Sequence, residues 1–310
     1  MMRFLAISLG VITFFSALTT YVVFSQRRSF PQNRQIVFEM GDQNHAVYGI
    51  QPTSGFGDRL HILFDPTYTF QDRYVTGVDC SPDSRSLIFW YIFLYRFNLA
   101  DENLTQIVLG QGLRQQSVWS PDGKRIAYID DIADRQPREI FVIDANGTNK
   151  RQVTANDHKE TSLSWSPTGT EIAFTYSDPA QPSLAQQGLA LVEVASGAST
   201  ILYQGAKQVG DAAWSPDGTQ IAFDMADEDR VDIYTIHPDG SNLTRLTREA
   251  ADNIDPHWSP DGTLISYSAR DTGGHYQLYV INADGTNPYL VFSSFPDQDV
   301  FNRCWLTTNS

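Results

Sequence analysis

The chain has 310 residues, a formal net charge of −14 and two cysteines. Phosphate binding needs clustered lysine and arginine, so this charge argues against a nucleic-acid-binding protein and no nucleic-acid partner is expected. It fits a soluble extracytoplasmic body or a protein with a basic partner.

Residues 1–30 are predicted to form a membrane anchor and a short linker. The run from Phe4 to Phe24 is uncharged and mostly apolar, and it is long enough to span a bilayer as one transmembrane helix. The alternative is a cleaved signal peptide, which normally has a shorter apolar core and a small-residue cleavage site. Val23-Phe24-Ser25 matches such a site only weakly, so the length favours an uncleaved anchor.

Five later stretches repeat one pattern. The last four read WSPDGKRIAY, WSPTGTEIAF, WSPDGTQIAF and WSPDGTLISY, and the first is the degenerate CSPDSRSLIF. A self-similar period of about 40 to 50 residues indicates one supersecondary unit that is copied along the chain. The copies begin at Cys80, Trp119, Trp165, Trp214 and Trp258.

Each copy predicts four antiparallel strands. The S-P-D-G segment favours a type I turn with a glycine bulge, and the apolar residues after it favour a strand buried on both faces. A second turn, such as Asp144-Ala145-Asn146-Gly147-Thr148, then joins two further strands. Four strands per repeat are typical of a propeller blade.

These motifs resemble the WD-like, PD40-type repeat of TolB-like β-propellers. The resemblance rests on W-S-P-D-G, the following I-A-[FY], an I-Y-V-type strand and a D-G-[ST]-N turn, and the clear copies cover residues 75–292. It implies a six-bladed propeller, usually outside the cytoplasm and working through protein contacts. The α/β domain that precedes the propeller in TolB has no counterpart in the pattern, so the resemblance does not extend to a role in the Tol–Pal system.

The chain ends supply a further blade in two pieces. Residues 34–40, 46–50 and 60–64 resemble the second, third and fourth strands of a repeat, and residues 299–305 resemble a first strand. We therefore predict an all-β fold over residues 31–310, a six-bladed β-propeller of four-stranded antiparallel blades. The C-terminal strand joins the N-terminal blade and closes the ring. The alternative is five blades with ragged ends.

The two cysteines fall on neighbouring blades of this predicted ring. The position at which the clear repeats have the tryptophan of W-S-P is called the tryptophan place. Cys80 occupies this place in its repeat, and Cys304 lies one residue before the tryptophan place of the C-terminal strand. Because side chains alternate across a strand, this offset lets the two residues point toward each other or apart. A disulfide that staples the ring and a pair of separate buried thiols both remain open.

Strand direction sorts the loops onto two faces. The repeated turns share one face, where Asp122, Asp217 and Asp261 are interpreted as turn residues. The variable loops share the other face, which is acidic, and polar residues stand three positions before most tryptophan places, where they could ring the channel mouth. Ordinary solvated loops and a merely wet channel are the alternatives. The predicted binding residues are Gln116, Asp131, Asp134, Asp157, Glu160, Asp211, Asp227, Asp252, Asp255, Asp271, Asp299 and Asn302.

Catalytic motifs are missing from the sequence. There is no G-x-S-x-G, C-x-x-C or H-E-x-x-H segment, so no catalytic residue and no cofactor are predicted. His45, His257 and His275 would lie toward the variable face and are the candidates for a metal site, although isolated histidines are more often structural.

We expect a non-catalytic, membrane-tethered propeller outside the cytoplasm, either periplasmic or extracellular. Its acidic loop face would bind a protein or a component of the cell envelope. The alternatives are a lyase or hydrolase, metal-dependent or not, with its site at the central funnel, and a purely structural spacer. The oligomeric state is not predicted.

Overall fold

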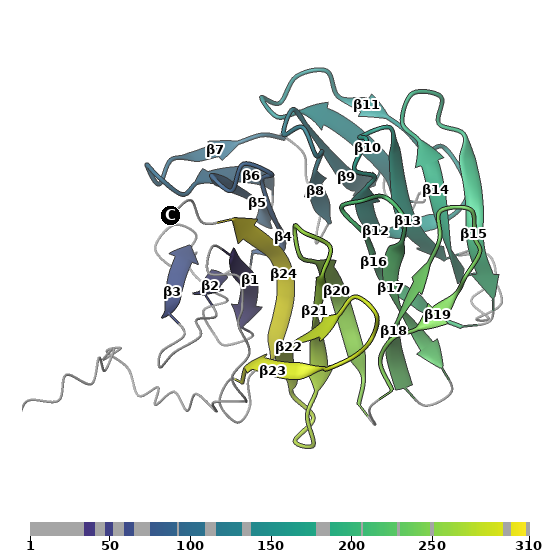
Figure 1. Ribbon diagram of the computed structural model, residues 1–310. Coiled ribbons are helices and arrows are strands. Elements are labelled where there is room, and N and C mark those ends of the chain that lie inside the picture. The colour runs from purple at the N-terminus through teal and green to yellow at the C-terminus, as the bar shows by residue number, and fades with distance from the viewer. Residues whose placement is uncertain are drawn as a thin grey trace, which may run out of the picture.

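The computed structural model describes twelve segments of the chain, and within them all regular structure is β-strand. These segments are residues 34–40, 47–51, 59–64, 75–91, 93–108, 116–131, 138–177, 187–205, 207–227, 230–248, 251–293 and 299–307. The strands form six four-stranded antiparallel sheets. Figure 1 shows the sheets arranged around a common axis, which the innermost strand of each sheet faces.

Five of the sheets are blades built from four consecutive strands. Blade 1 contains β4 (Thr76–Cys80), β5 (Ser86–Tyr91), β6 (Phe93–Asn98) and β7 (Leu104–Gln106). Blade 2 contains β8 (Ser117–Trp119), β9 (Arg125–Asp131), β10 (Arg138–Asp144) and β11 (Arg151–Gln152). Blade 3 contains β12 (Lys159–Trp165), β13 (Glu171–Ser177), β14 (Gln187–Glu193) and β15 (Ser199–Gly205). Blade 4 contains β16 (Val209–Trp214), β17 (Ile221–Asp227), β18 (Arg230–Ile236) and β19 (Thr244–Arg245). Blade 5 contains β20 (Asn253–Trp258), β21 (Leu264–Arg270), β22 (Tyr276–Asn282) and β23 (Tyr289–Phe292).

The remaining sheet, here called the closing sheet, takes strands from both chain ends. Its order is β24 (Val300–Thr307), β1 (Arg34–Met40), β2 (Val47–Gln51) and β3 (Arg59–Phe64). The predicted pairing of the C-terminal strand with the first N-terminal strand is confirmed, because β24 runs antiparallel to β1 with Ile36 opposite Trp305.

The predicted fold class nevertheless needs correction. The sequence gives five continuous blades, and the unit counted as a sixth is a composite sheet rather than a blade of consecutive strands. No helix occurs in the described ranges, so none there could cross a membrane. The transmembrane helix expected over residues 4–24 lies outside the described residues and forms no part of the described fold.

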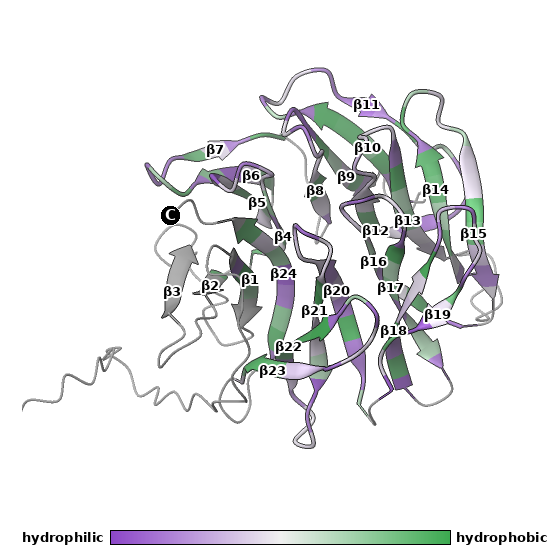
Figure 2. Cartoon of the chain, in the orientation of Figure 1, coloured by the Kyte–Doolittle hydropathy of each residue, from purple (hydrophilic) through white to green (hydrophobic). Residues whose placement is uncertain are grey.

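The core consists of six apolar clusters, one at each junction between neighbouring sheets. Between blades 3 and 4, for example, Leu189 and Ala173 of blade 3 pack with Phe223 and Trp214 of blade 4. Figure 2 accordingly shows hydrophobic residues along many strands of the ring. A blade therefore buries its apolar surface only when both neighbours are present, which makes closure of the ring a condition for the whole core.

The repeated S-P-D-G segments form the predicted turns. In blade 2 the Gly123 amide donates to the Ser120 carbonyl at 2.9 Å, and the Ser120 hydroxyl donates to Asp122 at 2.6 Å. Gly123 has a φ of 66°, which an L-residue with a side chain rarely adopts. The same serine–aspartate bond recurs at Asp217 and Asp261. These aspartates are turn residues, as the sequence indicates.

Tryptophan side chains link successive sheets. The Trp165 indole N–H donates to the Val118 carbonyl at 3.2 Å, and Trp258 donates to Ala213 in the same way. In each pair the acceptor is the residue before the tryptophan place of the preceding blade.

A disulfide takes this position between the closing sheet and blade 1. Cys80 stands in the tryptophan place, Cys304 stands in the acceptor place, and the two sulfurs are bonded, with the Cα atoms 5.9 Å apart. A covalent bond thus occupies the junction where the two chain ends meet, 224 residues apart in sequence.

Replacing both cysteines, Cys80→Ser with Cys304→Ser, should lower the free energy of unfolding by about 2–4 kcal/mol, because the unfolded chain loses a long covalent loop. Urea denaturation followed by tryptophan fluorescence measures this. The wild-type protein under reducing conditions should unfold at the midpoint of the variant, and reductant should not move the variant. Equal midpoints for the two proteins under oxidising conditions would contradict the prediction.

Candidate functional site

A cavity of about 380 Å³ lies on the axis of the ring. The inner strands β4, β8, β12, β16, β20 and β24 all contribute to its lining. Among the residues that line it, Arg303 is the one side chain with a permanent positive charge, whereas three are aspartates. Those aspartates are Asp79, Asp211 and Asp255.

β-bulges in the inner strands aim several of these side chains. The pairing of β16 with β17 skips from Val209 to Ala212, and the pairing of β20 with β21 skips from Ile254 to His257. Asp211 and Asp255 are the bulged residues, and each stands three positions before a tryptophan place. Bulges often re-aim a side chain next to a functional site, and here they turn two carboxyl groups toward the axis.

Gln116 connects two blades across the cavity. Its side-chain amide donates to the Asp211 carboxylate at 3.3 Å, and its side-chain oxygen accepts the Leu163 amide at 2.6 Å. Asn302 is fully buried and donates to the Asp255 carbonyl at 3.0 Å. The structure therefore places Gln116 next to Asp211, and Asn302 next to Asp255.

The side chain of Asp224 in β17 accepts hydrogen bonds from the backbone of both bulges. One of its oxygens accepts the Asp211 amide at 3.0 Å and the Asp255 amide at 3.3 Å. Burial, and then the negative charge of Asp211, raise the pKa of Asp224 and of Asp255 well above the ordinary range. Arg303, 3.7 Å from Asp255, opposes this rise without cancelling it. The pKa values of these carboxyl groups rise because compensating positive charge is scarce on the axis.

Two other groups on the cavity wall are perturbed by burial. The pKa of Asp79 is raised to about 7, although its carboxylate accepts the Trp119 amide of blade 2 at 2.8 Å. The pKa of His257 is lowered to about 4, so its imidazole is neutral at pH 7. A neutral imidazole, and carboxyl groups that can ionise when a cation approaches, favour the binding of a cationic group over that of an anion.

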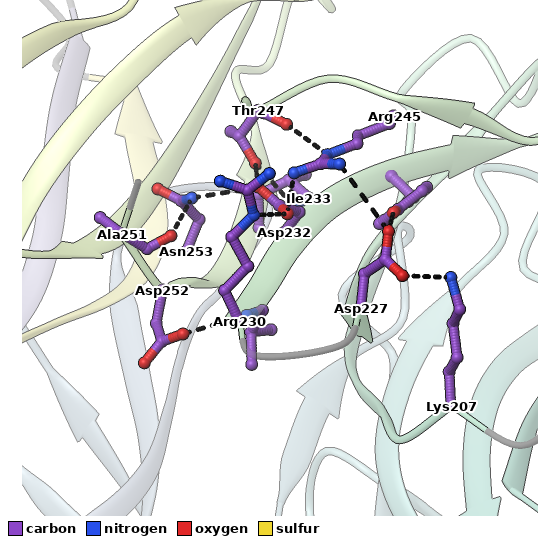
Figure 3. A network of polar contacts seen from close by, with 12 residues as sticks. Lys207, Asp227, Arg230, Asp232, Ile233, Arg245, Thr247, Ala251, Asp252 and Asn253 are labelled. Carbon is purple, nitrogen blue, oxygen red and sulfur yellow. Dashed lines mark hydrogen bonds and ion pairs between the residues drawn. The ribbon is translucent and has the colours of Figure 1, made fainter. Parts of the chain in front are cut away.

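Two of the acidic loop residues on the rim, Asp227 and Asp252, are paired with basic side chains. Asp227 contacts Lys207 at 2.6 Å and Arg245 at 3.7 Å, as Figure 3 shows. Asp252 accepts the Val231 amide at 3.0 Å and pairs with Arg270 at 3.3 Å. These two carboxylates are therefore neutralised locally by lysine and arginine side chains.

The other predicted binding residues lie apart from the cavity lining. Asp157 is exposed, Asp271 accepts the Gly273 amide in its own loop, and Asp299 accepts the Tyr276 amide. Glu160 is fully buried between blades 2 and 3, where burial raises its pKa to about 7. Asp131 belongs to β9, and nothing is described of its side chain; Asp134 lies outside the described residues.

The three candidate metal-binding histidines do not form one site in the described structure. His257 lines the axial cavity, His275 lies 3.7 Å from Asp299, and His45 falls outside the described residues. Within the segments that the structure describes, no group of three or more His, Cys, Asp or Glu side chains is arranged to hold a metal ion.

Asp79, Asp224 and Arg303 were missed from the sequence. Asp79 immediately precedes the tryptophan place of its repeat, and Arg303 immediately follows the polar register, so both stand on inner strands. Asp224 interrupts the apolar run IAFDM, where the other clear repeats have Ile129, Thr175 and Ser268. An aspartate within a strand that is buried on both faces was the feature of the sequence that could have identified Asp224.

The comparisons with known proteins agree with this architecture. The family model described as the TolB beta propeller domain, PD40, matches residues 125–295, more than half of the chain. The chain belongs to the TolB β-propeller (PD40) family. No curated protein sequence matches it.

Solved structures share the propeller fold at low identity. A putative TolB from Agrobacterium tumefaciens is 20% identical, with a TM-score of 0.66 over 91% of this chain and 100% of that one. TolB from Acinetobacter baumannii is 16% identical, with a TM-score of 0.71 over 88% of this chain and 66% of that one. An oligogalacturonate lyase from Vibrio parahaemolyticus is 15% identical, with a TM-score of 0.56 over 86% and 75%. Proteins of the PD40 fold thus include both TolB and a lyase, so the fold alone does not decide the activity.

Substituting Asp79→Asn should remove a pH dependence of stability. The folded state keeps the Asp79 proton up to a pKa of about 7, whereas the unfolded chain releases it near the ordinary value of 3.8. Stability of the wild-type protein therefore falls as pH rises from about 4 to 7, and the variant should show a flatter profile in this window. Urea midpoints between pH 4 and 8 measure it. The control Asp122→Asn should keep the wild-type slope, because the Ser120 hydrogen bond lowers the pKa of Asp122 below the window.

Substituting Arg245→Met should destabilise the protein by about 3 kcal/mol, because removing one partner leaves a buried carboxylate less compensated. Asp232 is fully buried, and Arg245 donates to it at 2.5 Å. Chemical denaturation gives the value. The surface control Lys207→Met, which removes an exposed partner of Asp227, should have little effect. Equal losses in the two variants would show that the buried pair is no more important than the exposed one.

Proposed function

We propose that this PD40 propeller is a non-catalytic binding module whose axial cavity receives a basic side chain from a protein partner. The carrying observation is the cluster of three aspartates in the lining, whose carboxyl groups an entering cation would help to ionise and for which Arg303 is the one permanently charged partner in that lining. Low-dielectric walls focus such a field and raise the local concentration of cationic groups. The cavity volume of about 380 Å³ is large enough for one arginine or lysine side chain and its hydration water.

Proton release accompanies binding in this proposal. Burial, and then the negative charge of Asp211, raise the pKa of Asp224 and of Asp255, which disfavours their ionised forms. An entering cation favours their ionised forms, so the site gains attraction as it loses protons. Affinity for a basic peptide should therefore rise with pH, because protons compete with the entering cation for the carboxylates.

The proposal places the propeller outside the cytoplasm and tethers it to a membrane through residues 4–24. The apolar length of that run supports the tether. The Cys80–Cys304 disulfide supports an oxidising compartment, because such bonds are rare where thiols are kept reduced. A partner in the cell envelope follows from this location.

The binding test uses fluorescent short peptides that contain a single arginine, and matched peptides in which citrulline replaces the arginine. Wild-type protein should bind the arginine peptide more tightly, and added salt should weaken the binding. Asp211→Asn should reduce the affinity roughly tenfold, because it removes an ionised group from the axis. Fluorescence anisotropy measures the dissociation constants.

The matched control is Asp157→Asn, which neutralises an exposed carboxylate of the same face away from the cavity. It should leave the affinity unchanged. Equal losses in both variants would assign binding to the general acidic face rather than to the axis. Equal binding of the arginine and citrulline peptides would refute the proposal.

A further inference from the structure

The outermost strand of blade 3 differs from the outermost strands of the blades on either side. β15 has seven residues, whereas β11 of blade 2 and β19 of blade 4 have two residues each. Figure 1 shows β15 at the outer edge of the ring. Because the neighbouring outer strands are so short, they do not extend along the length of β15. Its first three residues are accordingly exposed, namely Ser199, Thr200 and Ile201.

The first half of β15 has a free hydrogen-bonding edge. Next to the hairpin turn, the Glu193 amide donates to the Ala198 carbonyl at 2.9 Å, so these two residues form a hydrogen-bonded pair. In an antiparallel ladder such pairs alternate with pairs whose N–H and C=O groups point away from the partner strand. Ser199 and Ile201 belong to the second kind of pair and direct their main-chain groups outward. β15 is the last strand of its sheet, so no described strand pairs with these groups.

The usual devices that prevent pairing at an exposed edge are missing from this half of β15. Natural edge strands are blunted by charged side chains, by proline or by being very short. β15 reads STILYQG, and residues 194–205 contain neither a charged residue nor proline. The β-bulge at Leu202 lies after the exposed residues. Ile201 is 54% exposed, which is the largest exposed fraction among the large hydrophobic residues that the structure describes.

The charge distribution favours a second copy of the chain as the occupant of this edge. A net charge of −14 makes two copies repel each other over most of their surface, so an uncharged strand is where they can approach. A basic or acidic segment of another protein would find no opposite charge on β15. Antiparallel pairing of a strand with itself also satisfies two-fold symmetry, the commonest symmetry of soluble homo-oligomers.

We propose that two copies of the chain form a dimer by antiparallel pairing of β15 with β15, with the two-fold axis at Thr200. In this register the outward main-chain groups of Ser199 bond those of Ile201 in the second copy, and the reverse. Thr200 faces Thr200 of the second copy in a pair without main-chain bonds, where threonine side chains interact favourably. The blade 3 sheets of the two copies then form one continuous sheet.

This inference goes beyond the proposed function, because no residue of β15 lines the axial cavity. The dimer would present two axial cavities, one in each copy. One strand pair buries less than the roughly 1,600 Å² of a standard protein interface, so we expect a weak dimer with a dissociation constant on the order of 50 µM.

Sedimentation equilibrium of the full chain in a mild detergent, over about 5–300 µM, measures this constant around its expected value. Thr200→Lys should weaken the dimer about tenfold or more, because two ammonium groups would lie directly opposite each other across the two-fold axis. The substitution also makes the net charge less negative. A general reduction in repulsion would therefore strengthen association rather than weaken it.

Thr244→Lys is the matched control, because Thr244 is an exposed threonine on β19, the outermost strand of blade 4. It changes the net charge by the same amount and should not weaken the dimer. A wild-type chain that stays monomeric throughout the concentration range would overturn the proposal and leave β15 free for a strand of another protein. Dimers that persist in Thr200→Lys would overturn it as well, and would assign the contact to another surface, such as the predicted anchor.

A cross-linking experiment tests the register. The Cα atoms of an antiparallel pair without main-chain bonds lie about 4.5 Å apart, which a disulfide can span. Thr200→Cys should therefore form a covalent dimer under mild oxidation, seen as a doubled mass on a non-reducing gel. Thr244→Cys, whose new thiol lies away from the two-fold axis, should remain monomeric on that gel. Equal cross-linking of the two variants would contradict the register.

The dimer and the axial site can fail separately. Thr200→Lys should bind the single-arginine peptide with wild-type affinity, because the substitution lies outside the axial cavity. Asp211→Asn should leave the dissociation constant of the dimer unchanged for the same reason. Loss of peptide binding in Thr200→Lys would show that β15 is not independent of the axial site and would overturn the separation of the two surfaces.

Discussion

The whole structure depends on the junction between the closing sheet and blade 1. Every apolar cluster of the core lies between two sheets, so no blade is fully buried until the ring is complete. Between blades that follow each other in sequence, the connecting chain holds the neighbours together. The C-terminal strand β24 does not follow β1 or blade 1 in sequence, and within the described residues its pairing with β1 and its contacts with blade 1 hold it in the ring. At other junctions an indole N–H donates a hydrogen bond to the preceding sheet. The disulfide takes this position between β24 and blade 1, so a covalent bond joins two segments that are far apart in sequence.

Closure also creates the chemistry of the axis. Inner strands that converge around an axis leave a polar cavity, and the bulges in them turn Asp211 and Asp255 inward. Asp224 then binds the backbone of two neighbouring blades through one carboxylate oxygen, so the same group stabilises the blade junction and concentrates acidity at the centre. The carboxyl group of Asp224 must be buried to accept hydrogen bonds from two strands, so it cannot also be solvated by water. Its raised pKa is a consequence of that position.

Much of this was predictable because the repeat fixes the strand order and the turn chemistry. The type I turns, the ring closure and the polar register three residues before the tryptophan place follow from the spacing of the WSPDG copies. The bulges do not, because a two-for-one pairing leaves no mark in hydrophobic alternation. The ion pairs of two rim aspartates were also not predictable, for a different reason. Asp227 and Asp252 read as free charges in sequence, but their partners Lys207 and Arg270 lie 20 and 18 residues away. Pairing at that range depends on the fold.

The most specific feature of the molecule lies where the repeat is broken. Gly188 and Val209 are unremarkable as single residues, and neither attracts notice in a search for catalytic or charged motifs. Their meaning appears only when each is compared with the residue at the same register in other blades, where Glu139 and Glu160, or Asp232 and Asn253, fill the junction. At the junction of blades 3 and 4 glycine and valine stand in these two registers, and the junction is packed by apolar side chains instead. In a ring of similar units, such an asymmetry distinguishes one junction from the others.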